Sequence, residues 1–186
     1  MTYGSRPENH YPASSKLLHW LVAICVLTTA PVAIAMVSIG KGSTQDALYN
    51  FHKSLGLLIL VLMVLRLVNR LARGAPLPDP EIEAWQKTVS SIVHTSLYVL
   101  LIAMPIVGYI ANAASDTETP FFGLFTVPPI IGTHEELSKQ LFTIHRWVGF
   151  LVIILALTHI SAALYHYFIR HDHVLQRMLP RFLGGF

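Results

Sequence analysis

The chain has 186 residues, of which 53% are apolar and only 12% are charged. Because about a quarter of the residues in a typical soluble domain are charged, this composition favours a membrane protein. The single cysteine, Cys25, excludes an intramolecular disulfide, a CxxC redox pair and a cysteine-held iron–sulfur cluster. The net charge of +3 does not indicate a nucleic-acid partner, since the basic residues lie between apolar runs rather than in one patch.

Four apolar stretches are long enough to cross a bilayer, for which a helix needs about 20 residues. The sequence therefore predicts an all-α protein, a four-helix transmembrane bundle that forms a single domain over residues 1–186. The first stretch lacks a small-residue cleavage site and is too long for a signal-peptide core, so we expect it to be retained. Ser14 or Ser15 is the expected N-cap of the first helix, and Pro105, with Gly108 close by, predicts a kink in the third. The predicted spans are residues 17–39, 51–71, 89–113 and 141–169.

The positions of lysine and arginine predict the orientation, because cytoplasmic connections carry the excess of basic residues. Of the thirteen such residues, nine lie in the N-terminal tail, the second connection and the C-terminal tail, and four lie on the other side. Both termini are therefore expected to face the cytoplasm. The proline- and acid-rich segments 79–83 and 116–129 are expected to be surface connections.

Ten histidines are present, and six of them lie within predicted spans or at their ends. A polar side chain in hydrocarbon needs a partner, so such histidines are candidate functional residues. For any single one, a hydrogen bond between two helices is a sufficient explanation. The remaining four are expected to be solvated surface residues. The six are His19, His52, His94, His145, His159 and His166, and the four are His10, His134, His171 and His173.

His145 and His159 are 14 residues apart in the fourth span, which corresponds to about 21 Å of rise along nearly the same helix face. His52 enters the membrane level with His145, whereas His19 enters from the other side, level with His159 or His166. Two histidine pairs on different helices, one above the other, are typical of two stacked b-type haems, whose irons each take two imidazoles. Zinc fits less well, because the spans contain no Asp or Glu and a 14-residue gap cannot share one ion.

Four motifs in combination are distinctive, and together they cover residues 14–180. They are SSKLLHWLVA around His19, FHKSLGLLILVLMVLRLVNRL from Phe51, HTSLYVLLIAMPIVGYI from His94, and IHRWVGFLVIILALTHISAALYHYF from Ile144. With these motifs the chain resembles the bacterial cytochrome b561 family, the small di-haem cytochromes of the inner membrane. The resemblance implies that His19 and His159 are the axial ligands of an inner haem, and that His52 and His145 are those of an outer haem.

The resemblance also implies electron transfer between haem and ubiquinone, and at least one family member is described as a superoxide oxidase that passes electrons to ubiquinone. We therefore expect an oxidoreductase of the bacterial inner membrane, with two haem b groups, that connects an outer donor, superoxide among the candidates, with ubiquinone. One alternative is a haem-bearing membrane anchor and electron-relay subunit of a multi-subunit dehydrogenase or hydrogenase. Another is a non-redox carrier of a metal or small solute. The lateral apolar surface faces membrane lipid and leaves room for a homodimer or a partner redox subunit.

Four basic residues are candidates to bind the haem propionates. Lys53 and Arg146 each follow an outer-haem ligand, where they would also attract an anionic substrate such as superoxide. Arg66 and Arg70 end the second span on the inner side. Anchoring of the span ends in the interface explains all four residues as well.

His166 is the first candidate for a quinone-binding or proton-relay group, and His94 is the second. Both lie near the inner ends of their spans. Imidazole can donate a hydrogen bond to a carbonyl oxygen and can also supply a proton. Packing at the membrane interface is the alternative explanation for both residues.

Overall fold

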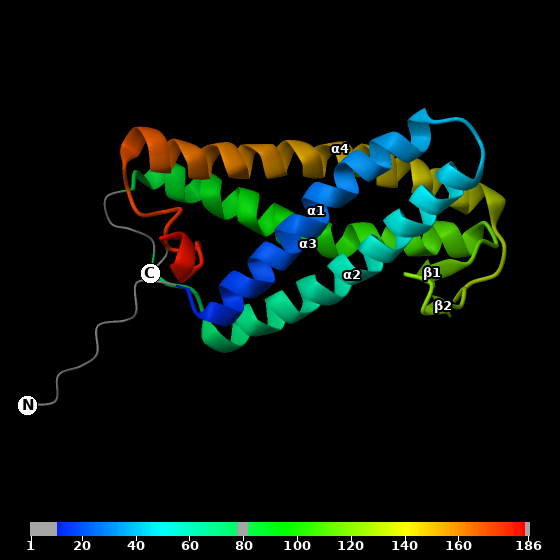
Figure 1. The fold of residues 1–186 in the computed structure, drawn as a ribbon, viewed down its shortest axis with the longest axis horizontal. Coiled ribbons are helices and arrows are strands. Elements are labelled where there is room, and N and C mark those ends of the chain that lie inside the picture. The colour runs from blue at the N-terminus through cyan, green and yellow to red at the C-terminus, as the bar shows by residue number, and fades with distance from the viewer. Residues whose placement is uncertain (1–10, 78–81, 185–186) are drawn as a thin grey trace, which may run out of the picture.

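The protein is described here by a computed structural model, which covers residues 11–77 and 82–184. Within these residues the fold is a bundle of four long helices, as the sequence predicts. Helices α1 and α2 pack side by side, α3 and α4 form a second pair, and contacts between α2 and α3 join the pairs (Figure 1). The helices are α1 (Ala13–Ser38), α2 (Ser43–Arg73), α3 (Ala84–Ala114) and α4 (Glu135–Tyr165).

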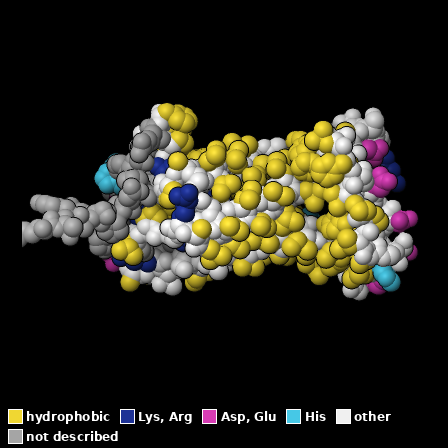
Figure 2. Space-filling view, turned by 90° about the horizontal axis from the view of Figure 1, so that it is seen from below, with side chains coloured by type: hydrophobic (Ala, Val, Ile, Leu, Met, Phe, Trp, Pro, Cys, Tyr) yellow, Lys and Arg dark blue, Asp and Glu magenta, His cyan; other side chains and the backbone are white. Residues whose placement is uncertain are grey.

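Each of these four helices, in the described part of the chain, is long and apolar enough to cross a membrane. Hydrophobic side chains cover the middle of the molecule, and charged side chains gather towards its two ends (Figure 2). Large apolar residues such as Ile24, Val61 and Ile154 are more than half exposed. An apolar surface of this extent is rare on a soluble monomer, and in a bilayer it faces lipid. The chain is therefore a multi-pass membrane protein.

The helices extend beyond the predicted spans. Helix α2 begins at Ser43 rather than at residue 51, and α4 begins at Glu135 rather than at residue 141. Hydropathy marks only the part of a helix that lies in hydrocarbon, whereas these helices continue into polar sequence. Acidic residues in their first turns, Asp46 in α2 and Glu135 in α4, interact favourably with the helix dipole.

The predicted serine cap of α1 is wrong. The N-cap residue is Pro12, and no side chain caps the helix. Instead, Ser14 Oγ donates to Asn69 Oδ1 at 2.9 Å, and Asn69 Nδ2 donates to Ser15 Oγ at 2.7 Å. The two serines therefore fasten the start of α1 to the last turns of α2.

The connection between α3 and α4 contains a short antiparallel hairpin that the sequence analysis did not predict. Its strands are β1 (Thr119–Phe121) and β2 (Phe125–Val127), and Gly123 in the turn has a φ of 73°. The end of the bundle that carries it is called the hairpin end below (Figure 1). Of the other predicted connection, residues 79–81 lie outside the described residues, as does His10.

The opposite end, called the terminal end below, holds the start of α1 and the C-terminal segment (Figure 1). After α4 the chain forms a π-helical turn over His166–Arg170 and then reverses direction at His171, whose φ is 54°. The segment that follows packs back on α1, where Lys16 Nζ donates to Leu179 O and Trp20 Nε1 donates to Met178 O, both at 3.0 Å.

Candidate functional site

The hairpin end holds one pair of facing histidines. The ring centroids of His52 on α2 and His145 on α4 lie 6.0 Å apart, with the ring planes at 79°. The Nδ1 atoms of both rings are buried and make no hydrogen bond. The backbone of Thr29 lies beside His52, and that of Met104 lies beside His145.

The terminal end holds a second pair with nearly the same geometry. The ring centroids of His19 on α1 and His159 on α4 are 6.1 Å apart, at 78°. A third ring joins this group, because His94 on α3 lies 5.0 Å from His159. His94 is also 3.2 Å from Ser90 Oγ through its Nδ1 atom. The three rings form a cluster that we call the inner histidine cluster.

The spacing within both pairs suits one metal ion held between two imidazoles. An imidazole nitrogen binds a transition metal at about 2 Å and lies about 1 Å from the ring centre, so two opposed ligands have centroids about 6 Å apart. The described residues contain no group of three or more His, Cys, Asp or Glu side chains that could hold a metal ion by themselves. A metal ion held by either pair would need further ligands from a bound group, and the four nitrogens of haem would provide them. The residues present fit haem and do not fit a protein-only zinc site.

The helices that carry each pair are not close neighbours in the bundle. Helix α4 packs closely on α3, whereas its backbone hardly approaches those of α1 and α2 in the described chain. The contacts of His19 and His52 with α4 are therefore made by their imidazole rings rather than by close backbone packing.

A second feature distinguishes the paired histidines from the others, and the sequence analysis missed it. The residue four positions later, which lies one turn away on the same helix face, is small in all four cases. At Gly56 an added Cβ would meet no neighbouring group within 4 Å, and at Gly149 it would meet only Met104 Cε at 3.7 Å. After His94 and His166 the same position holds Tyr98 and Arg170. The small residues are Ala23, Gly56, Gly149 and Ala163, which follow His19, His52, His145 and His159.

Gly108 on α3 makes room for the ring of His145. A Cβ at this position would lie 2.9 Å from His145 Cε1 and 3.1 Å from its Nδ1. Contacts under 3.0 Å require one of the groups to move, and here the neighbour is the imidazole itself. The sequence analysis associated Gly108 only with a kink at Pro105, because hydropathy cannot show which side chain faces a glycine.

Two backbone oxygens of the hairpin are held by residues that follow His52. Lys53 Nζ donates to Glu118 O at 3.0 Å. Ser54 is almost fully buried; its Oγ lies 3.0 Å from Pro120 O and accepts a hydrogen bond from Phe122 N at 2.9 Å. The hairpin is thereby fixed beside the His52–His145 pair. Arg146, the other predicted cation at this end, is exposed on α4.

Arg66 and Arg70 lie at the terminal end, near the inner histidine cluster. Arg66 donates to Ser15 O at 3.1 Å, and its guanidinium lies 5.5 Å from the ring centroid of Tyr98. It is close enough to His19 and His159 to interact with them electrostatically. A small pocket beside it is lined by Tyr11, Asn69 and Arg70, among other residues.

His166 lies apart from the inner histidine cluster. The residue is 9% exposed, and its Nδ1 atom lies 2.5 Å from Asp172 Oδ2. Sequence reasoning left open whether His19 faces His159 or His166, and the structure places it opposite His159. The histidines predicted to be on the surface and described by the structure are exposed; they are His134, His171 and His173.

The four membrane-crossing helices carry histidines that face one another in pairs. This arrangement places the chain in the class of integral membrane proteins with imidazole pairs between their helices. Residues 10–181 match the family model described as prokaryotic cytochrome b561. The chain belongs to this family, whose members are membrane electron-transfer proteins of bacteria.

Three relatives match over nearly their whole length. Cytochrome b561 homolog 2 of Escherichia coli K12 is 31% identical over 97% of this chain and 96% of its own. Cytochrome b561 homolog 1 of the same organism is 30% identical over 93% of this chain and 98% of its own. A probable superoxide oxidase of Yersinia pestis, CybB, is 28% identical over 90% of this chain and 94% of its own.

Proposed function

We propose that the chain is a di-haem b-type cytochrome that moves electrons across the bacterial inner membrane between an outer donor and ubiquinone. The observation that carries this proposal is the repeated geometry of two histidine pairs, with centroids 6.0 and 6.1 Å apart, on one shared helix. When bound, haem supplies reversible one-electron chemistry. The protein's part is to fix the two groups at different depths, about 21 Å of helix rise apart for the 14 residues that separate the α4 ligands.

His19 and His159 are the proposed ligands of one haem, and His52 and His145 of the other. His94 is close enough to His159 to compete with His19. Tyr98, one turn along from His94, is a bulky ring that would crowd a porphyrin bound at His94, whereas the same position after His19 is the small Ala23. His94 is therefore assigned to the surroundings of the inner haem rather than to its iron.

The four basic residues near the pairs are the proposed partners of the haem propionates. Lys53 and Arg146 would serve the haem at the hairpin end, and Arg66 and Arg70 the haem at the terminal end. Lys53 has one donor committed to Glu118 O, and an ammonium group has two more. Arg66 is half-buried against Ser15 and Tyr98. Arg146 and Arg70 are exposed, so their side chains can extend towards a propionate.

The terminal end is proposed to face the cytoplasm and the hairpin end the periplasm. An even number of spans places both termini on one side, and the excess of lysine and arginine lies there. The outer donor then meets the His52–His145 haem, and the quinone meets the terminal end.

Superoxide is the proposed donor, supported by the likeness to the probable superoxide oxidase of Yersinia pestis. Two superoxide anions would each give up one electron and leave as O₂, while ubiquinone takes both electrons and two protons to become ubiquinol. Lys53 and Arg146 supply positive charge beside the outer pair, which attracts an anion at short range.

Replacing both cations by glutamine tests this electrostatic role. Superoxide should reduce the purified K53Q/R146Q protein more slowly and with a weaker dependence on ionic strength. An unchanged rate and salt dependence would rule the role out. Lys41→Gln, at an exposed lysine between α1 and α2, is the matched control for a loss of positive charge on the same side.

His166 is the proposed quinone-binding or proton-relay residue. It is nearly buried at the terminal end, and its Nδ1 atom contacts Asp172 Oδ2. His166→Gln should slow ubiquinone reduction by the reduced protein while leaving both haems bound. Undiminished quinone reduction would remove His166 from the role and bring His94 forward.

A haem-bearing anchor subunit of a larger dehydrogenase or hydrogenase is the second candidate. The hairpin favours it, because Phe122, Leu124 and Phe125 expose 41%, 77% and 57% of their surface. These side chains could contact lipid headgroups or a partner subunit. Stoichiometric co-purification of a redox subunit from the native membrane would favour this candidate, whereas superoxide- or quinone-linked turnover by the isolated chain would favour the first.

A further inference from the structure

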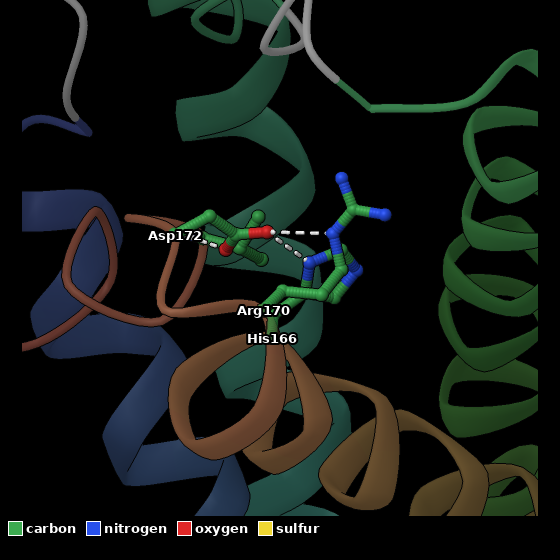
Figure 3. A network of polar contacts seen from close by, with 4 residues as sticks. His166, Arg170 and Asp172 are labelled. Carbon is green, nitrogen blue, oxygen red and sulfur yellow. Dashed lines mark hydrogen bonds and ion pairs between the residues drawn. The ribbon is translucent and has the colours of Figure 1, made fainter.

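A polar network at the end of α4 contains none of the four proposed haem ligands. His166 and Arg170 converge on the carboxylate of Asp172 (Figure 3). Asp172 Oδ2 lies 2.5 Å from His166 Nδ1 and 3.4 Å from Arg170 Nε, and its Oδ1 accepts a hydrogen bond from Val174 N at 3.1 Å. The side chains of His166 and Asp172 are only 11% and 17% exposed.

The backbone is shaped to make this contact. On a regular α-helix a residue six positions later lies about 120° away around the axis, at 100° per residue, so Asp172 could not face His166. The π-helical turn and the left-handed conformation of His171 return the chain, and Asp172 N then donates to His166 O at 3.2 Å. π-helical turns occur frequently at functional sites.

Asp172 is a carboxylate at neutral pH. Burial acts to raise its pKa, but the hydrogen bonds from His166 and Val174, with the charge of Arg170, hold the pKa below its ordinary value. An ionised carboxylate only accepts hydrogen bonds. His166 must therefore carry its proton on Nδ1, and Nε2 becomes the nitrogen that can bind a ligand.

We propose that Asp172 is a positioning residue that fixes one proton of His166 on Nδ1 and leaves Nε2 as the nitrogen that, once protonated, donates to the quinone carbonyl. The inference rests on the proposed role of His166 and adds the residue that orients its imidazole. His166 takes a proton at Nε2 from the aqueous side, passes it to the reduced carbonyl oxygen and returns to the Nδ1–H form. Two electrons from the donor and two such protons convert one ubiquinone to ubiquinol.

The direct test is ¹⁵N nuclear magnetic resonance of the histidine-labelled holoprotein in lipid nanodiscs, with the His166 signals assigned by their loss in His166→Gln. In the neutral ring, Nδ1 should show a bonded proton and Nε2 none. In Asp172→Asn, whose side chain can either accept or donate, the two tautomers should both be populated. Asp172→Glu, which keeps the charge, should restore the Nδ1–H form at least in part. A proton on Nε2 in the unaltered protein would overturn the proposal without any variant having to fold.

Single-turnover ubiquinone reduction is the second readout. Asp172→Asn should slow it by about tenfold or more, as is typical when the partner that orients a functional histidine is lost, and Asp172→Glu should recover part of the rate. Asp116→Asn is the matched control, since Asp116 is exposed at the hairpin end and its positive φ suits asparagine. An unchanged rate in Asp172→Asn would overturn the proposal.

The two readouts separate this inference from the function on which it rests. If His166→Gln leaves quinone reduction intact, the role of His166 fails and the relay fails with it, whatever the tautomer. If His166→Gln slows quinone reduction but Asp172→Asn does not, His166 acts without Asp172, and only the inference is overturned.

Discussion

The two ends of the bundle hold histidine pairs of nearly equal spacing in very different surroundings. At the hairpin end no third histidine ring of the described residues joins the pair, Gly108 packs against the His145 ring, and the hairpin is held by Ser54, two residues after His52. At the terminal end the pair is joined by a third ring, an arginine and a separate histidine–carboxylate contact. This difference fits the proposed function, in which the hairpin end would hold one haem and admit an electron, whereas the terminal end would also handle protons.

The largest expected effect is the loss of one haem without the other. His145→Ala removes a proposed ligand at the hairpin end only, so the haem content per chain should fall from about two to about one, measured as pyridine haemochrome against protein. His134→Ala, at the exposed start of the same helix, should keep both. Loss of both haems or of neither in His145→Ala would show that the two ends are not independent sites.

A smaller substitution at the hairpin end should lower the haem content in the same way but to a lesser extent. Gly108→Ala places a methyl group 2.9 Å from the His145 ring, and overpacking of this kind costs about 1–3 kcal/mol. We expect partial loss of the outer haem and a shifted reduction potential for what remains. Gly132→Ala, where an added Cβ meets no neighbouring group within 4 Å, should titrate like the unaltered protein. If both variants had the same haem content and reduction potentials, the His145 ring would be free to move away from the added methyl group.

The hairpin is expected to depend on one buried hydroxyl. Ser54→Ala removes the acceptor of Phe122 N and the donor to Pro120 O, and a hydrogen bond of this kind contributes about 0.5–1.5 kcal/mol. Protease cleavage within the hairpin should become faster, whereas Ser38→Ala, at an exposed serine that bonds only its own helix, should have no such effect. Unaltered protection in Ser54→Ala would mean that Lys53 and β pairing fix the hairpin by themselves.

The smallest expected effect concerns acid stability at the terminal end. The pKa of Asp172 is lowered in the folded protein, so its carboxylate stabilises the fold above the ordinary value of about 4. This contribution is lost as the pH falls through the lowered pKa. The difference in melting temperature between the unaltered protein and Asp172→Asn should therefore be constant near neutrality and shrink below about pH 4. A difference that grows on acidification would contradict the ionised state of Asp172.

The sequence predicts the parts of this structure that depend on periodic patterns. Hydropathy predicts the four helices, and histidine spacing predicts which ends of α4 face His19 and His52. The small residue four positions after each paired histidine is also visible in the sequence. It distinguishes His19, which is followed by Ala23, from His94, which is followed by Tyr98. Hydropathy alone gives no reason to look for it, because glycine and alanine are common in membrane helices.

The remaining features depend on contacts that close only in three dimensions. The clearance between Gly108 and His145 depends on how α3 and α4 pack. The contact between His166 and Asp172 requires a π-helical turn and a left-handed residue, and neither has a marker in the sequence around His171. The hairpin is held by Ser54, which lies more than sixty residues before it.

The central claim is that each histidine pair holds one haem, and the most direct measurement is the haem content and reduced-minus-oxidised spectrum of the purified, unaltered chain. We expect two b-type haems per chain and two components in a redox titration, one for each end of the bundle. A colourless protein, or a single haem that titrates as one component, would contradict the claim.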